Sequence, residues 1–135
     1  MRVLLWYCDR FAWQPALKTL EEAREGTPGE HEKAVVAFVH VEPKDVERIG
    51  KVETRLLKQI KWLMRKWETP RVVLHSFTHL GEEKAPADVA CALLERVGAR
   101  LEGAGLEVLH TPWGHFVDLQ LAAPGHPLAR VFTEF

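Results

Sequence analysis

The sequence predicts an α/β fold in which a single mixed β-sheet packs against two main helices. Three observations lead to this prediction. Short, almost continuous apolar runs of the kind found in buried strands occur at residues 2–8, 33–41 and 71–77. Two longer segments, 43–67 and 86–102, instead repeat apolar residues every three or four positions. No internal repeat or low-complexity tract divides the 135 residues, so we expect one domain over 1–135.

The N-terminal quarter contains the one segment whose structure the sequence leaves open. R-V-L-L-W-Y-C at 2–8 predicts the first strand, but residues 9–32 allow two interpretations. F-A-W-Q-P-A-L is compatible with an edge strand that carries Pro15, whereas L-K-T-L-E-E-A-R-E favours a helix by propensity. T-P-G-E then predicts a turn before the second strand, K-A-V-V-A-F-V-H-V at 33–41.

The first helical segment, 43–67, is amphipathic. Its apolar face is formed by Ile49, Val52, Leu56, Ile60, Leu63 and Trp67. Its opposite face carries Arg48, Lys51, Arg55, Lys58, Arg65 and Lys66, with Trp62 among them. Such a face is typical of a solvated helix, but cations beside an exposed indole also suit contacts with RNA phosphates and bases.

The second half of the chain predicts one more helix and three strands. Pro70 ends the first helix, and R-V-V-L-H-S-F at 71–77 follows as a strand. The second helix is expected to begin near Pro86, a favoured first-turn residue, and to end at the glycines of E-G-A-G at 102–105. The segments 106–110 and 115–121 then alternate as strands, and the T-P-W-G between them predicts a hairpin.

The composition excludes several classes of protein. The formal net charge of −1 gives no global field that would draw the chain onto DNA or RNA. The two cysteines lack C-x-x-C spacing, and no run approaches the ~20 apolar residues of a membrane span. We therefore expect a cytoplasmic protein without membrane or DNA partners. The chain has no asparagine, three glutamines and one serine, a bias typical of heat-adapted proteins.

The stretch H-S-F-T-H at 75–79 places polar groups at the end of a predicted strand. His75 and His79 would share a face of a helix and so a metal ion, but along a strand they stand about 13 Å apart. Ser76 lacks the G-x-S-x-G turn that exposes a hydrolase nucleophile. These groups either cap a strand or, because strand ends of α/β folds bind ligands, belong to a binding site.

Several segments together resemble the editing domain at the N-terminus of archaeal-type threonyl-tRNA synthetases, which has a D-aminoacyl-tRNA deacylase-like fold. They occur in the order M-R-V-L-L, V-V-A-F-V-H-V-E, F-T-H-L, V-A-C-A-L-L-E-R-V, T-P-W-G and G-H-P-L-A. The resemblance covers nearly the whole chain and is tightest from Val72 to Ala129. It implies a hydrolase that removes serine wrongly attached to tRNA(Thr), with a pocket that receives the 3′-terminal aminoacyl-adenosine.

The resemblance also implies roles for individual residues. His79 corresponds to the pocket histidine and is the expected catalytic residue. The expected substrate-binding residues are Ser76, Phe77, Trp113, Gly114, His115 and Phe116. No cofactor or metal is expected, because in these deacylases the backbone and the 2′-hydroxyl of the tRNA carry much of the chemistry. A site that hydrogen-bonds the serine hydroxyl without room for the threonine methyl would reject the correct product.

Two positions depart from the family pattern. Val117 stands where the family has lysine, and Arg130 stands where it has glutamate after G-H-P-L-A. These departures favour an alternative function, a catalytically silent relative that binds tRNA, a small ligand or a synthetase. In either case the resemblance leads us to expect a stand-alone chain that acts in trans, a homodimer, and threonyl-tRNA synthetase as a possible partner.

Overall fold

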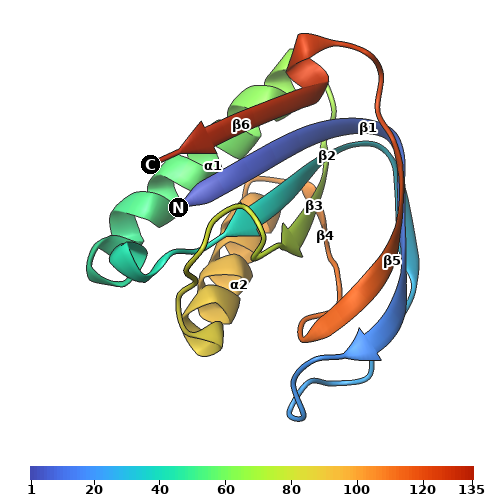
Figure 1. Ribbon diagram of the computed structural model, residues 1–135. Helices are drawn as coiled ribbons and strands as arrows, with labels where there is room; N and C mark the ends of the chain where they lie inside the picture. Colours follow the sequence, from blue (N-terminus) through green and yellow to red (C-terminus); the bar gives the residue numbers. More distant parts are fainter.

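The protein is built around one mixed, six-stranded β-sheet with two helices on one of its faces (Figure 1). The computed structural model describes all residues from 1 to 135. The elements are β1 (Arg2–Lys18), β2 (Gly29–His40), the 3₁₀ helix η1 (Pro43–Arg48), α1 (Ile49–Lys66), β3 (Arg71–Ser76), α2 (Ala87–Gly103), β4 (Glu107–His110), β5 (His115–Ala122), the 3₁₀ helix η2 (Pro127–Ala129) and β6 (Arg130–Glu134). The predicted α/β fold is therefore confirmed.

The strands lie in the order β4-β3-β2-β1-β5, and β6 also pairs with β1. β2, β3 and β4 are parallel to one another, whereas β1 is antiparallel to β2, β5 and β6. The first residues of β1, 2–6, pair with β6, and its later residues, from Arg10 to Lys18, pair with β5. Two strands thus share one side of β1, one after the other.

β1 settles the ambiguous N-terminal segment in favour of a strand. It runs through Pro15 to Lys18, and the helix that propensity favoured at 17–25 does not form. β1 pairs with β2 only as far as Trp13, so Pro15 has a strand on one side alone, and a register shift follows it. A proline without an N–H is tolerated there, as at the edge of a sheet.

The hairpin predicted around T-P-W-G is wrong. β4 pairs in parallel with β3 at one edge of the sheet, whereas β5 pairs with β1 at the other. The turn therefore crosses from one edge of the sheet to the other, as the orange ribbon in Figure 1 shows. Two alternating strands around a glycine indicate a turn but do not determine which neighbours the strands will pair with.

The helices cover one face of the sheet and enclose the larger core (Figure 1). This core contains 22 buried residues, including Val3 and Leu5 of β1 and Leu56 and Ile60 of α1. Trp62, expected on the basic face as an exposed indole, is half-buried and packs against this core. The half-buried ring offers less surface for stacking on a base than the exposed indole that the sequence suggested.

The opposite face of the sheet is concave. Figure 1 shows that β1 and β2 bend strongly, which carries β5 out of the plane of β3 and β4. A second cluster of seven buried residues occupies this face, among them Phe11, Trp13 and Phe38. Phe11 packs on Trp13 and Phe38 at ring-centroid distances of 5.9 and 6.4 Å. The bend thus buries aromatic side chains that a flat sheet would expose.

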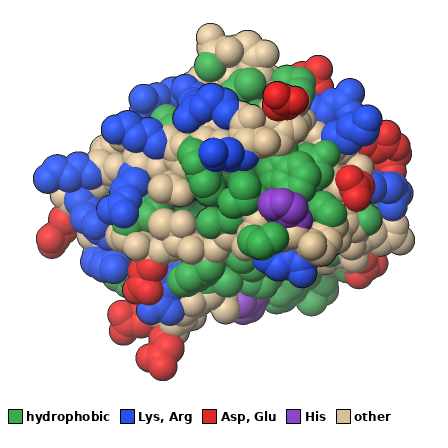
Figure 2. Space-filling model, turned by 90° about the horizontal axis from the view of Figure 1, so that it is seen from above, with side chains coloured by type: hydrophobic (Ala, Val, Ile, Leu, Met, Phe, Trp, Pro, Cys, Tyr) green, Lys and Arg blue, Asp and Glu red, His purple; other side chains and the backbone are tan.

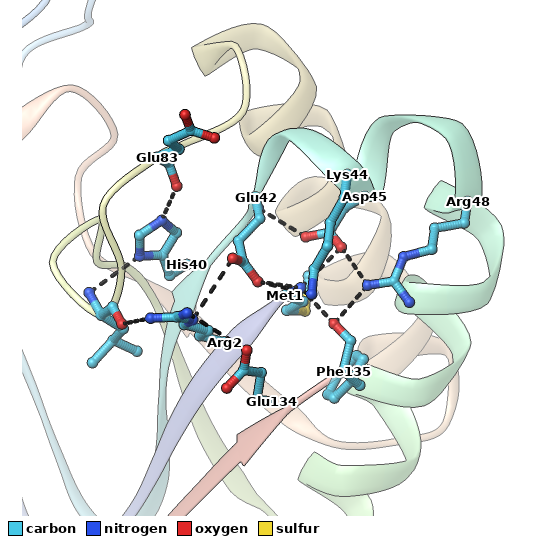
Figure 3. A network of polar contacts seen from close by, with 11 residues as sticks. Met1, Arg2, His40, Glu42, Lys44, Asp45, Arg48, Glu83, Glu134 and Phe135 are labelled. Carbon is cyan, nitrogen blue, oxygen red and sulfur yellow. Dashed lines mark hydrogen bonds and ion pairs between the residues drawn. The ribbon is translucent and has the colours of Figure 1, made fainter.

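Buried charges meet near the start of β1, in a group we call the N-terminal corner: Met1, Glu42, Asp45 and Arg48 with the Phe135 carbonyl (Figure 3). The Met1 amino nitrogen lies 2.9 Å from Asp45 Oδ1, 2.8 Å from Glu42 Oε1 and 2.6 Å from the Phe135 oxygen. Arg48 reaches the same Asp45 atom at 2.9 Å.

None of the helices is long and apolar enough to cross a membrane.

Candidate functional site

A cavity of about 760 Å³ lies at the carboxyl ends of β3 and β4. Its walls come from the strand ends, the first turns of α2, the turn between β4 and β5, and the loop after β1. The lining residues include Thr19, Leu20, Ser76, Phe77, His79, Ala87, Ala90, Leu94, Trp113, Phe116 and Val117. The carboxyl ends of parallel strands are where α/β folds bind ligands, so this cavity is the candidate site.

The cavity brings together two sequence segments that are more than thirty residues apart. Ser76 ends β3 and is followed by Phe77 and His79, whereas Trp113 and Gly114 precede β5 and His115 and Phe116 begin it. All of these predicted site residues line the same cavity. The resemblance assigned both segments to one pocket, but the sequence predicted a hairpin at T-P-W-G and not the crossing between the two sheet edges that places them there.

His79 stands at an exposed position among aromatic rings. Its ring lies edge-on to Phe77, with centroids 5.2 Å apart, and nearly parallel to Phe116, with centroids 6.4 Å apart. Phe116 is itself 54% exposed, so these rings lie at the mouth of the cavity. The ring nitrogens of His79 are therefore available to a ligand flanked by apolar surfaces.

Gly114 fixes the turn that carries the second segment. Its φ of +74° lies in the left-handed region, and a Cβ built on it would lie 2.6 Å from the Cβ of Ala23. The Gly114 carbonyl accepts a hydrogen bond from the Thr19 N–H at 2.7 Å. Only glycine satisfies both the conformation and the close approach, which presses the turn against the loop after β1.

Two side chains, His40 and Arg2, hold the loop that carries His79 through hydrogen bonds to its backbone. The fully buried His40, at the end of β2, accepts the Leu80 N–H on Nδ1 at 3.1 Å and contacts the Glu83 carbonyl through Nε2 at 2.7 Å (Figure 3). Arg2 donates to the Leu80 carbonyl at 2.8 Å. Sequence reasoning missed both residues; a histidine that ends the apolar run V-V-A-F-V was the available signal.

The comparisons with known proteins agree with this arrangement. Residues 1–135 match the Archaea-specific editing domain of threonyl-tRNA synthetase. The chain belongs to this editing-domain family. It is 29% identical to the threonine–tRNA ligase of Methanopyrus kandleri over 133 residues, covering 97% of this chain and 21% of the ligase. The ligases of Nitrosopumilus maritimus and Hyperthermus butylicus are 32% and 31% identical, covering 96% and 100% of this chain and 21% and 23% of theirs.

The chain therefore spans about a fifth of the length of these ligases. Among solved structures, the c-Myc DNA Unwinding Element Binding Protein superposes with a TM-score of 0.67 at 11% identity, covering 100% of this chain and 99% of that one. At this identity the likeness shows the fold alone. The mixed sheet with two helices is therefore a fold that the two chains share.

The structure separates the two positions that depart from the family's pattern. Val117 lines the cavity and adds an apolar side chain to its wall. Arg130 lies outside the cavity lining; it donates to the Pro124 carbonyl at 2.7 Å and stacks over the Trp6 ring at 5.6 Å. The two side chains therefore belong to different surfaces of this editing domain.

His75 was weighed in the sequence as a metal ligand and takes a different place in the structure. Its ring lies on the concave face next to Phe38, and its Nδ1 is 2.8 Å from Thr111 Oγ1. Burial lowers the pKa of His75 to about 4, so the ring is neutral at neutral pH. No three His, Cys, Asp or Glu side chains are grouped to hold a metal ion. Thr111, the partner of His75, was missed.

Proposed function

We propose that the chain is an aminoacyl-tRNA deacylase that hydrolyses the ester of seryl-tRNA(Thr) in trans. One observation carries this proposal: the F-T-H-L and T-P-W-G segments that gave the family resemblance line one cavity at the strand ends. The cavity volume of about 760 Å³ lies within the range of small-ligand sites and suits a terminal aminoacyl-adenosine. Family membership over residues 1–135 supports the same substrate.

The arrangement suggests how the reaction proceeds. The adenine ring stacks among the aromatic side chains at the mouth, such as Phe77 and Phe116, because stacking on exposed rings binds bases. His79 stands between these rings and contacts the ribose or the ester, with the 2′-hydroxyl of the tRNA assisting the attack of water. Serine fits the inner part of the cavity, and the extra methyl of threonine is rejected by its wall.

Deacylation kinetics test this function. The decay of seryl-tRNA(Thr) and threonyl-tRNA(Thr) is measured with and without the 135-residue protein, with no added metal. We expect selective loss of the serine ester, and a decrease of about a hundredfold for His79→Ala, the lower end of what a positioned acid–base group contributes. His126→Ala, an exposed histidine outside the cavity lining, serves as the matched control. Equal decay with and without protein would refute the proposal.

A second candidate function rests on Val117. An apolar side chain in the cavity wall, at the family's lysine position, favours a silent relative that binds aminoacyl-tRNA without cleaving it. Such a protein would protect seryl-tRNA(Thr) from spontaneous hydrolysis instead of accelerating it. The same decay curves separate the two functions, and Val117→Lys would restore cleavage only if the lysine is what the reaction lacks.

The proposed assembly is a homodimer. β5 and β6 expose Phe116, Leu119, Leu121 and Phe132, of which Phe132 is 53% exposed. Figure 2 shows hydrophobic side chains gathered on one face between Lys- and Arg-rich and mixed-charge surfaces. Exposed apolar patches of this kind commonly mark protein interfaces. Sedimentation analysis of the wild type and Phe132→Glu tests the dimer, which the charged variant should weaken.

A further inference from the structure

The inner wall of the cavity contains one polar atom whose role the proposed reaction does not explain, Nε2 of His75. His75 lies on β3 one residue before its end, directly beside Phe38 of β2 in the parallel register. Its ring centroid is 4.8 Å from that of Phe38 and 5.9 Å from that of Phe77. The imidazole packs against both phenyl rings, which fix its position, and Thr111 is its hydrogen-bond partner.

His75 is nearly closed off from solvent, with 7% of its surface exposed, and this remaining surface belongs to the cavity lining. Nδ1 is hydrogen-bonded to Thr111 Oγ1, whereas Nε2 has no hydrogen-bond partner in the protein. It differs from Nε1 of Trp6 and Nε2 of His31, which also lack partners but are sealed from solvent. His75 Nε2 is thus a deeply placed polar atom that a ligand can reach.

The neighbours of Thr111 favour one direction of the hydrogen bonds. The Leu74 carbonyl can only accept, and it lies 3.5 Å from Thr111 Oγ1. With the hydroxyl proton directed to that carbonyl, Thr111 Oγ1 accepts from the Nδ1–H of His75 at 2.8 Å. A neutral imidazole carries one N–H, so Nε2 then presents a lone pair to the cavity and accepts a hydrogen bond.

We propose that His75 Nε2 accepts a hydrogen bond from the side-chain hydroxyl of the aminoacyl group and so determines specificity for serine. The inference rests on the proposed deacylase function and adds a residue to it. The size of the substrate parts supports the placement: adenosine needs the wide, aromatic mouth around His79 and Phe116, which leaves the small amino-acid side chain for the inner wall. The hydroxyl is the donor that a serine side chain offers there.

This contact predicts how the cavity treats analogues of serine. A site that hydrogen-bonds a hydroxyl discriminates against a ligand without it, because the buried acceptor then loses its water without gaining a partner. Alanine, which is serine without the hydroxyl, should therefore be a poorer substrate. Threonine keeps the hydroxyl, so His75 does not exclude it, and its rejection depends on the room for the methyl group.

The test compares two esters of the same tRNA that differ by one oxygen, seryl-tRNA(Thr) and alanyl-tRNA(Thr). We expect the wild type to cleave the seryl ester faster, with a preference of about tenfold. His75→Asn keeps an amide near the Nδ1 position to contact Thr111 but lacks the Nε2 atom, so it should lose the preference by slowing the seryl reaction alone. His126→Asn should keep it. An unchanged preference in a folded His75→Asn protein would overturn the inference.

A second measurement needs no variant. Wild-type protein labelled with ¹⁵N in its histidine rings is titrated with amide-linked, non-hydrolysable seryl- and alanyl-adenosine. The seryl compound should shift the Nε2 resonance of His75, and the alanyl compound should leave it in place. Equal shifts with both compounds would overturn the inference. Absence of deacylation with this selective shift would instead refute the proposed reaction while supporting the hydroxyl contact.

Discussion

The N-terminal corner and the cavity both bury polar groups, but they treat them in opposite ways. In the corner, the Met1 ammonium faces Asp45 and Glu42, and Arg48 joins the same carboxylate (Figure 3). In the cavity, Nε2 of His75 has no hydrogen-bond partner in the protein, although only 7% of the surface of this residue is exposed. Buried polar groups are nearly always paired in folded proteins. The paired set therefore indicates a structural role, and the unpaired atom indicates a place for a ligand.

The two regions should also respond differently to substitutions. Removing one member of a buried ion pair leaves the other charge without compensation, which destabilises the fold. Removing an atom that has no partner in the protein sacrifices no internal contact. Substitutions in the N-terminal corner should accordingly lower stability with little effect on substrate specificity. Loss of His75 Nε2 should alter specificity with little effect on stability.

Asp45→Asn should have the largest effect on stability. Asp45 is fully buried, and its carboxylate pairs with Met1 and Arg48 and accepts the Glu42 N–H at 2.8 Å. Loss of its charge leaves the Met1 ammonium with Glu42 and the Phe135 oxygen, and Arg48 with the Phe135 oxygen alone. We therefore expect the free energy of unfolding to fall by about 4 kcal/mol. Urea denaturation measures it. The exposed Glu47→Gln is the control, and a loss below about 1 kcal/mol would contradict a structural role for the corner.

Gly114→Ala should lower both stability and activity. The methyl group would sit in a backbone conformation with φ of +74° and 2.6 Å from the Cβ of Ala23. We expect about 2 to 3 kcal/mol of destabilisation, from conformational strain and from displacement of the turn, and a loss of deacylation beyond it. Thermal unfolding measures the loss of stability, and single-turnover kinetics measure the loss of deacylation.

Two other glycines separate the contributions. Gly105 has a φ of +84° but nothing within 4 Å of an added Cβ, so Gly105→Ala tests strain alone. Gly125 has neither feature and should tolerate alanine. If Gly105→Ala reduced deacylation as much as Gly114→Ala, the close approach of the turn to Ala23 would have no special role in the cavity.

The two regions should respond to acid in different pH ranges. Burial lowers the pKa of His75 from 6.5 to about 4, so between these values the unfolded chain binds a proton that the folded protein does not. The stability that neutral His75 contributes is therefore present above pH 6.5 and is lost as the pH falls, by about 2 kcal/mol at pH 5.

Glu42 of the corner contributes lower on the pH scale. Burial raises its pKa, but the Met1 ammonium and the nearby Lys44 and Arg2 outweigh burial and hold it below its usual 4.5. The stability that ionised Glu42 contributes to the folded protein is therefore lost only as the pH falls below 4.5. Urea denaturation from pH 7 to 3.5 of the wild type, His75→Phe and Glu42→Gln separates the ranges. A wild type and His75→Phe with parallel curves above pH 4.5 would contradict the assignment to His75.

Much of the fold follows from local patterns in the sequence. The 3.6-residue period predicted α1 and α2 within a few residues, because helices are held by contacts close in sequence. The pairing of β4 and β5 did not follow, since strand partners are chosen by packing across the whole sheet. The long β1 was open for the same reason: the residues after Trp13 form a strand because β5 lies beside them.

The candidate site divides in the same way. The segments around His79 and Trp113 were identified from their motifs, and the structure places them in one cavity. Thr111 and His40 were not identified, because a threonine before a proline and a histidine at a strand end have no distinctive spacing. Their roles come from three-dimensional contacts, with His75 and with the Leu80 N–H, that no local pattern encodes.

The smallest expected effect concerns the one side chain that joins the two regions. Arg2 pairs with Glu42 of the corner at 3.6 Å and donates to the Leu80 carbonyl in the loop of His79 at 2.8 Å. Its side chain is 32% exposed, and His40 also holds that loop, so Arg2→Met should reduce stability by only about 1 kcal/mol.

If Arg2 couples the regions, the loss appears in the loop before it appears elsewhere. We expect backbone amides of residues 78–84 to exchange about fivefold faster in Arg2→Met, since about 1 kcal/mol corresponds to that factor, while amides of the buried β2 keep their protection. Hydrogen exchange followed by mass spectrometry measures both. Arg10→Met, which breaks an exposed ion pair with Glu30 at 2.7 Å, is the matched control. Unchanged exchange in the loop would mean that the corner and the cavity are independent, and that His40 alone positions His79.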